Sequence, residues 1–167
     1  RSFSFNSPHG ACPTCTGLGT QRELDPDLIV PDPSLSLDEG AIKPWAQAAK
    51  SNSYYHQILR ALADHYGFST NTPWRELTAE QRELVLRGSG SETIMVSYRN
   101  HQGRSRRYQT TFEGVIPNLE RRYQETLSDH IHQWIERYMT SHPCPACHGR
   151  RLKPEALAVT VRGLAID

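Results

Sequence analysis

Four cysteines carry the clearest chemical signal in this sequence of 167 residues. They form two pairs, each with two residues between the partners: Cys12 with Cys15, and Cys144 with Cys147. A turn with this spacing lets both thiolates face one metal ion, and a tetrahedral zinc needs four such ligands at about 2.3 Å. The spacing therefore predicts one closed, structural four-cysteine zinc site that joins the two ends of the chain.

A redox-active thiol pair, disulfides and buried free thiols are the alternatives to a metal site. Gly17 and Gly149 each follow the second cysteine of a pair by two residues. Glycine permits a left-handed turn after the second ligand, which favours a metal site over redox chemistry. His142 and His148 stand beside the second pair and could each replace a cysteine, but with four thiols present we expect both at the surface.

A basic stretch is the second candidate site. Residues 93–112 contain no acid and four arginines. The planar guanidinium suits phosphate oxygens, and a β-hairpin that carries several of them can lie along a nucleic-acid backbone. Aromatic residues between them, Tyr98, Tyr108 and Phe112, could stack on exposed bases. The alternative is a solvated hairpin whose aromatic side chains belong to the core. The four arginines are Arg99, Arg104, Arg106 and Arg107.

Charge is distributed unevenly elsewhere in the chain. The formal net charge is only +1, which argues against a generally basic nucleic-acid binder. Residues 23–39 hold six acids and no Lys or Arg, whereas residues 137–154 hold no acid. Arg150 and Arg151 in that second window, and Arg121 and Arg122 near the start of an expected helix, are further candidate DNA contacts. For Arg121 and Arg122 the favoured alternative is an ordinary charged helix surface.

The elements that must position these residues predict an α+β fold. We expect a first zinc knuckle and flanking strand in residues 1–24, an insertion lobe in residues 25–140, and a second knuckle with a returning strand in residues 141–167. Apolar spacing, capping residues and turn residues predict the parts of this outline. They are strands at 2–6 and 156–161, an extended segment at 25–33, helices at 53–66, 78–88 and 118–140, a hairpin of strands 93–99 and 104–112, and a turn at Arg162 and Gly163.

Several function classes receive no support from the sequence. It lacks a GxxxxGK[ST] phosphate loop, an HExxH motif and a GxSxG motif, and a four-thiolate zinc has no open position for water. No apolar run approaches the roughly 20 residues of a membrane helix, so we expect no membrane partner. Paired cysteines that hold a metal fit a reducing cytoplasm. The start at Arg1 and the stop at Asp167 predict a piece of a longer protein.

Five segments together resemble the UvrA family, the damage-recognition ATPases of the bacterial excinuclease. They span nearly the whole chain, and the two cysteine motifs lie within them. The segments are Phe3–Pro8, Gly10–Gly19, Asp25–Ile29, Phe112–Tyr123 and Cys144–Leu152.

The resemblance implies that the four cysteines bind zinc and that the chain between them is an insertion domain beside the DNA. It implies a parent protein that scans double-stranded DNA for damage as a homodimer, hydrolyses ATP and hands the site to UvrB. The ATP-binding motifs of the family are absent from these residues, so we expect this piece neither to bind ATP nor to act as an enzyme. Contact through backbone and shape suits a surface that reads distortion rather than sequence.

Two other readings remain. The CxxCxGxG pattern of residues 12–19 also resembles the knuckles of DnaJ-type chaperones, so the chain could be a zinc-knuckle module that docks a partner protein through the acidic loop 23–39. A thiol enzyme would require reactive cysteines.

Overall fold

The computed structural model describes residues 3–49, 53–158, 160–161 and 164–165. The chain divides into two compact units. One unit combines residues 1–23 with residues 139–167, and the other comprises residues 24–138. The mixed α+β class is confirmed, and so is the meeting of the four cysteines, which form a buried cluster in the first unit.

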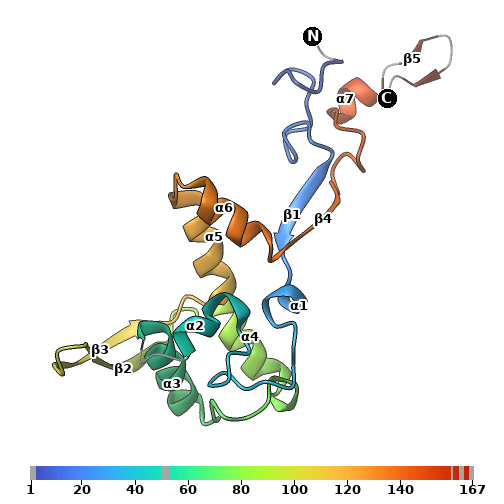
Figure 1. The fold of residues 1–167 in the computed structure, drawn as a ribbon. Coiled ribbons are helices and arrows are strands. Elements are labelled where there is room, and N and C mark those ends of the chain that lie inside the picture. Colours follow the sequence, from blue (N-terminus) through green and yellow to red (C-terminus); the bar gives the residue numbers. More distant parts are fainter. Residues whose placement is uncertain (1–2, 50–52, 159, 162–163, 166–167) are drawn as a thin grey trace. The chain divides into compact units, whose positions relative to one another are not determined.

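The cysteine unit contains little regular structure. Strand β1 (Thr20–Leu24) pairs with β4 (Met139–Pro143), and a short helix, α7 (Pro154–Leu157), follows the second cysteine pair. Strands β5 (Thr160–Val161) and β6 (Leu164–Ala165) form an antiparallel pair near the chain end. Figure 1 shows both cysteine-bearing segments beyond the β1–β4 ladder.

Two expected strands of this unit are wrong. Residues 3–6 form no strand: the Ser7 N–H donates to the Ser4 carbonyl at 3.3 Å and closes a turn there, and the Ser7 carbonyl accepts from the N–H groups of Gly10 and Ala11 in the next turn. Ala156 and Leu157 lie in α7, because Pro154 stands at the first helical position, where its missing N–H costs nothing. Of the described residues in the expected strand 156–161, Thr160 and Val161 are in strand β5, and the expected turn at Arg162 and Gly163 lies outside the described residues.

The second unit packs helices against a two-stranded hairpin. Its elements in chain order are α1 (Pro26–Ile29), the 3-10 helix η1 (Lys43–Trp45), α2 (Ala46–Ala49), α3 (Tyr54–Tyr66), the 3-10 helix η2 (Trp74–Glu76), α4 (Ala79–Arg87), β2 (Thr93–Arg99), β3 (Ser105–Thr111), α5 (Val115–Glu125) and α6 (Asp129–Glu136). Its core consists of fully buried aliphatic side chains from several of these elements, among them Ile29, Leu62, Val85, Ile94, Val96 and Leu119.

The prediction of helices α3 and α4 is confirmed, because their end signals are local. The Ser53 hydroxyl caps the start of α3 by accepting from the His56 N–H, and Gly67 ends the helix in the left-handed conformation. Thr78 and Gln81 form the expected capping box at the start of α4, with each side chain accepting from the other residue's N–H.

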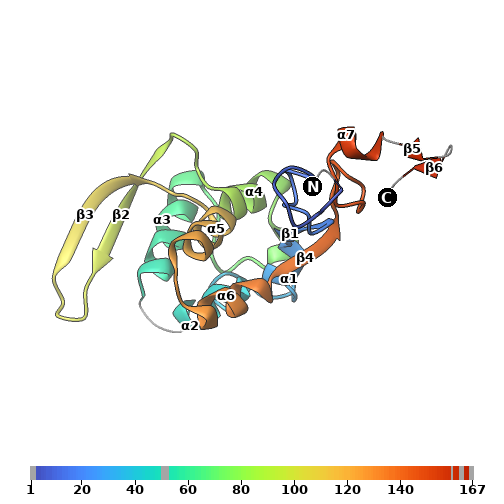
Figure 2. The same ribbon diagram turned by 90° about the horizontal axis from the view of Figure 1, so that it is seen from above.

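The hairpin is also confirmed, and its turn explains its register. The Asn100 side-chain oxygen accepts hydrogen bonds from the N–H groups of Gln102 and Arg104, and Gly103 adopts a φ of 77°. This turn sets Tyr98 opposite Arg106 and Val96 opposite Tyr108. Figures 1 and 2 show the hairpin projecting from the helices of its unit.

Two other expectations in this unit are wrong. Residues 25–33 are not all extended, because Asp25 accepts a hydrogen bond from the Asp27 N–H and Pro26 starts helix α1. The single helix expected at 118–140 is two helices, α5 and α6, followed by β4. Thr126 leaves the helical conformation with a ψ of 141°, and its hydroxyl accepts from the Ser128 N–H. Leu127, an apolar residue of this stretch that a single helix would have packed on the core, is 99% exposed.

Candidate metal centre and nucleic-acid interface

The four cysteine side chains form a compact and buried cluster. Their sulfur atoms all lie within 4.8 Å of one another. The Cys12 and Cys144 sulfurs are 4.0 Å apart, and the Cys15 and Cys147 sulfurs are 3.7 Å apart. A tetrahedron of zinc–sulfur bonds of about 2.3 Å has sulfur–sulfur edges of about 3.8 Å. The cluster therefore has the size and the donor set of a four-thiolate zinc site.

The two knuckles, residues 12–19 and 144–151, repeat one backbone conformation. Counted from the second cysteine, the residues one, two and four positions later all have positive φ angles. In the first knuckle they are Thr16 (52°), Gly17 (82°) and Gly19 (80°), and in the second they are His148 (52°), Gly149 (85°) and Arg151 (73°). Each knuckle thus curls around its own pair of thiols in the same way.

Reciprocal hydrogen bonds join the two knuckles. The Cys12 N–H donates to the Arg151 carbonyl, and the Cys144 N–H donates to the Gly19 carbonyl, both at 2.9 Å. Within each knuckle, the N–H of the same residue, Gly19 or Arg151, donates to the sulfur of its second cysteine at 3.2 Å. An N–H group that points at a sulfur atom stabilises the thiolate form of the cysteine, and the thiolate is the form that binds a metal.

The thiols also differ electrostatically. A hydrogen bond from the backbone of Cys15 lowers the pKa of the Cys12 thiol to about 7. Burial raises the pKa of the Cys147 thiol to about 11. A dication at the centre of the cluster would favour the thiolate form of both.

The Arg151 side chain makes two contacts within its own unit. Its Nε donates to the Gly17 carbonyl at 2.6 Å, and its guanidinium carbon lies 3.7 Å from the centroid of the Phe5 ring. The second knuckle therefore places a long side chain where the first has Gly19, and that side chain reaches back to the first knuckle. Its proposed role as a DNA contact stays a prediction, because this geometry gives it a structural role without testing the other.

The geometry of the cluster bears on two alternatives to a four-cysteine site, namely disulfides and a histidine ligand. Sulfur separations of 3.7 Å and 4.0 Å are far above the roughly 2.05 Å of a disulfide, and all four cysteines are free. His148 is exposed, and His142 pairs across the β1–β4 ladder with Glu23 at 3.2 Å. Among the described residues, the group with metal-ligand geometry contains the four cysteines and neither histidine.

The hairpin divides its arginines between two faces. Ile94 and Val96 on β2 are fully buried, and the inward face they define continues through Tyr98. Arg106 pairs with Tyr98 in the register and so shares this face, whereas Arg107 pairs with Ser97 and lies on the other. The polar sequence of β3 gave no alternation from which this division could be predicted.

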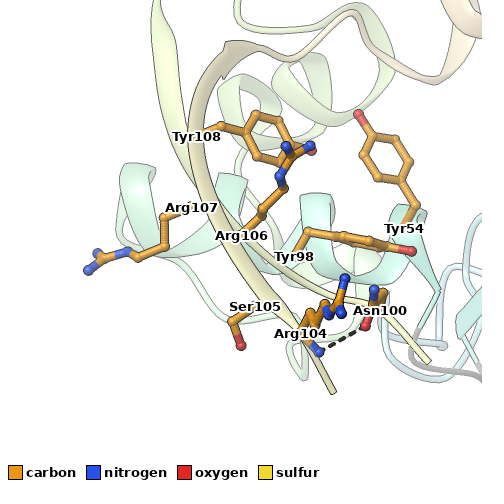
Figure 3. A pocket seen from close by; sticks show the side chains of 8 residues that line it. All are labelled: Tyr54, Tyr98, Asn100, Arg104, Ser105, Arg106, Arg107 and Tyr108. Atoms are coloured by element: carbon orange, nitrogen blue, oxygen red, sulfur yellow. Dashed lines mark hydrogen bonds between the residues drawn. The ribbon is translucent and has the colours of Figure 1, made fainter. Parts of the chain in front are cut away.

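A hollow of about 1200 Å³ opens on the inward face near the hairpin tip. Figure 3 shows Tyr98, Tyr108 and Arg106 from the hairpin facing Tyr54 at the start of α3, while the Arg107 side chain points away from them. The Tyr54 and Tyr98 rings lie edge to face with centroids 6.3 Å apart. Phe112, expected to be available for stacking, is instead a core residue that is 2% exposed and packs against Trp45.

Gln57 fixes the end of β2 to helix α3. Its side-chain oxygen accepts from the Arg99 N–H at 2.7 Å, and its side-chain nitrogen donates to the Arg99 carbonyl at 3.3 Å. Gln57 is only 8% exposed, so the pair of bonds lies largely out of solvent. Neither Gln57 nor Tyr54 was identified from the sequence, because both lie beside the apolar stripe of the helix rather than in a charged or cysteine motif.

The other candidate arginines make contacts within the protein. Arg121 forms ion pairs with Glu113 at 2.9 Å and Glu125 at 3.0 Å, and Glu113 raises the pKa of Arg121 above its ordinary value. Arg122 lies over the Trp134 ring, 5.2 Å from its centroid, and joins α5 to α6. Arg150 is exposed at the surface of the second knuckle.

Much of the acidic loop expected as a docking surface is committed to local structure. Asp25 caps α1, and the Asp32 carboxylate accepts from the Ser34 N–H. Glu39 accepts from the Ser36 N–H, and Asp38 accepts from the Thr70 hydroxyl. Because these carboxylates already accept hydrogen bonds within the protein, fewer of them are available to bind a basic partner.

In the described part of the chain, every helix is too short or too polar to cross a lipid bilayer.

Comparison with known proteins gives consistent results. The protein named UvrABC system protein A of Methanothermobacter thermautotrophicus is 52% identical over 166 residues, which cover 99% of this chain and 17% of that protein. The protein of the same name from Micrococcus luteus is 49% identical over 99% of this chain and 17% of its own length. This chain therefore spans about one sixth of the length of these relatives.

A solved structure and a family profile agree with these relatives. The crystal structure of UvrA2 from Deinococcus radiodurans matches 99% of this chain and 21% of that one, with a TM-score of 0.75 and 33% sequence identity. The profile of the family described as the UvrA DNA-binding domain matches residues 25–137, which include the whole hairpin and helices α3 to α6. From this match and the identities above, we conclude that the chain belongs to the UvrA DNA-binding domain family.

Proposed function

We propose that this chain binds double-stranded DNA without reading its sequence, through the arginines of the β2–β3 hairpin. The observation that carries the proposal is four exposed guanidinium groups on one projecting hairpin with no described carboxylate within ion-pair distance. Phosphate oxygens satisfy such groups, and each arginine bound to a phosphate releases counterions from the DNA. The charge of Arg121 is already balanced by Glu113 and Glu125, so Arg121 contributes less to the positive potential that attracts DNA.

The salt dependence of binding tests this proposal. Fluorescence anisotropy of the zinc-loaded chain with a labelled duplex gives the affinity across a series of salt concentrations. Replacing all four hairpin arginines with glutamine reduces the slope of log affinity against log salt by up to about 0.9 for each phosphate that the variant leaves unneutralised. Arg75→Gln with Arg87→Gln is the control, since both exposed residues lie outside the hairpin. An unchanged slope in the hairpin variant contradicts the proposal.

We also propose that Cys12, Cys15, Cys144 and Cys147 hold one structural zinc ion. The sulfur separations and the two N–H groups directed at sulfur support it. Four thiolates complete a tetrahedral shell, so the ion supplies folding energy and binds no reactive water. Metal analysis of the purified chain, with one zinc expected per chain, tests this assignment.

At the level of the whole protein, the names of the relatives support a role in excision repair. We propose that the parent is a cytoplasmic, homodimeric ATPase that recognises damaged DNA and passes it to UvrB. Residues 25–140 then act as an insertion lobe that contacts DNA, while ATP is bound by other parts of the parent, because this sequence has no phosphate loop. ATP turnover by the parent, measured with and without damaged duplex, tests the wider role.

A further inference from the structure

The hollow beneath the hairpin tip differs from the rest of the hairpin surface. On the inward face Ile94 and Val96 are fully buried, but two residues further along β2 Tyr98 lines the hollow. Tyr54 is 44% exposed there, although large aromatic side chains are usually covered. Aromatic surface thus lines a concave site that no described part of the chain fills.

The charge of the hollow is positive. Arg104, Arg106 and Arg107 line it together with the three tyrosines, although the Arg107 side chain points away from them (Figure 3), and none of the described residues in its lining is acidic. Burial, as the main cause, and a hydrogen bond with Tyr108, as the second, raise the pKa of Tyr54 to about 12. The Tyr54 hydroxyl therefore stays neutral at physiological pH. The hollow therefore attracts an anion and carries no competing negative charge.

The combination of aromatic faces and guanidinium groups fits a ligand that has a flat ring and an attached anion. An unstacked nucleotide has both: its base can stack on a tyrosine ring, and its phosphate can bind an arginine. The hollow is open to solvent on one side, which suits a nucleotide that remains part of a DNA strand.

We propose that this hollow binds a nucleotide that has left the base stack of a distorted duplex, with Tyr98 stacking on the base, Tyr54 contacting the edge of the base and Arg106 binding its phosphate. This inference rests on the proposed DNA binding and adds a second, separable interaction to it. In an intact duplex both faces of every base are covered, and pulling a base out costs a few kcal/mol, least where pairing is already broken. The hollow therefore adds affinity only at a distortion.

The experiment compares three labelled duplexes with the full zinc-loaded chain. The first is intact, the second carries one unpaired thymidine, and the third carries an abasic nucleotide at the same position. The last two share a distorted backbone and differ in the base alone. We expect the thymidine duplex to bind about ten-fold more tightly than the abasic one, in line with the measured effect of removing one base–aromatic stack. Equal affinity for the two overturns the inference and leaves the proposed duplex binding intact.

Variants on the two faces of β3 separate the two interactions. Arg106→Gln and Arg107→Gln remove the same charge from neighbouring positions, but only the Arg106 side chain points toward the tyrosines. Arg106→Gln should weaken binding to both distorted duplexes more than to the intact one, because both keep the phosphate of the displaced nucleotide, whereas Arg107→Gln should weaken binding to all three duplexes by the same factor. Identical effects of the two variants on the preference for distorted over intact duplex contradict the inference.

Aromatic substitutions provide the final check. Tyr98→Leu should abolish the preference for the unpaired base and preserve the affinity for the intact duplex, while Tyr98→Phe, which keeps the ring, should preserve both. If Tyr98→Leu retains the preference, the inference fails. If the unmodified chain binds none of the duplexes even at low salt, the proposed DNA binding itself fails.

Discussion

Arg151 and Gly19 occupy equivalent positions in the two knuckles, with φ angles of 73° and 80°. Each donates its N–H to a cysteine sulfur of its own knuckle and accepts through its carbonyl from the first cysteine of the other. A side chain at positive φ is strained by about 1 kcal/mol, so the interactions of the Arg151 side chain must offset this cost.

The Arg151 position can be dissected by two substitutions. Arg151→Ala removes the bond to the Gly17 carbonyl and the packing on Phe5 but keeps the strained backbone, whereas Arg151→Gly removes the same interactions and relieves the strain. We expect Arg151→Gly to be more stable than Arg151→Ala by about 1 kcal/mol in urea unfolding of the zinc-loaded chain. The reverse order would show that the backbone at this position is unstrained.

Gly17 should tolerate no side chain. A Cβ built at Gly17 overlaps the Phe5 carbonyl oxygen and comes within 3.3 Å of the Ala11 Cβ. We expect Gly17→Ala to lower the midpoint of thermal unfolding and to weaken zinc retention during dialysis against a chelator. Gly103→Ala is the control: its φ of 77° is similar, but nothing lies within 4 Å of the added atom, so the cost is limited to backbone strain of about 1 kcal/mol.

Removing one thiol should release the metal. Cys144 is fully buried, and Cys144→Ala leaves three sulfurs for an ion that requires four ligands. We expect the zinc content to fall from one per chain toward zero, with faster proteolysis of the cysteine unit, because binding energy at such a site is folding energy. A variant that is as stable as the unmodified chain without zinc would contradict the structural role of the metal.

The Gln57 clamp should control the outer half of the hairpin. Gln57→Met keeps the length of the side chain but removes both hydrogen bonds to the Arg99 backbone. We expect the Arg99 amide to exchange with solvent at least ten-fold faster by NMR, which corresponds to about 1.4 kcal/mol for the two missing bonds. The Ile94 and Val96 amides should remain protected, since those residues are held by the core. Uniform acceleration along β2 would mean that the hairpin opens as one unit.

The Glu113–Arg121 pair should make stability depend on pH. Hydrogen bonds from Arg121 lower the pKa of the Glu113 carboxyl below its ordinary value of 4.5. A depressed folded-state pKa stabilises the protein above the unfolded pKa, and this contribution is lost as the pH falls through the folded pKa. The unmodified chain should therefore exceed Glu113→Gln in stability near neutral pH by about 0.5 kcal/mol, a value limited by solvent screening, and the difference should vanish in acid. Urea unfolding at both pH values measures it.

Sequence reasoning succeeded where the signals are local. Ser53, Gly67 and the Thr78–Gln81 pair act within one helical turn, so the bounds of α3 and α4 could be predicted to within a residue. The meeting of the four cysteines could also be predicted, because a tetrahedral ion requires a fixed number of ligands of one type.

Sequence reasoning failed where contacts between distant parts of the chain determine the structure. The apolar spacing of residues 118–140 fits one helix, but α6 folds back so that Arg122 packs on Trp134 and His132 bonds to the Tyr123 carbonyl. The role of Arg151 depends on Gly17 and Phe5, more than 130 residues away in sequence. The faces of the hairpin on which Arg106 and Arg107 lie are set by the pairing of β3 with β2. They could not be predicted, because the sequence of β3 is polar on both faces.

The reciprocal bonding of the two knuckles has a consequence for synthesis of the protein. The first knuckle lacks its partner until the 128 residues between Cys15 and Cys144 have been made. At ribosomal rates of about 5–20 residues per second, this interval lasts about 6 to 26 seconds. During that time Cys12 and Cys15 are an open pair of thiols on a nascent chain, exposed to oxidants and to competing metals. The second knuckle ends that vulnerability at the moment it emerges.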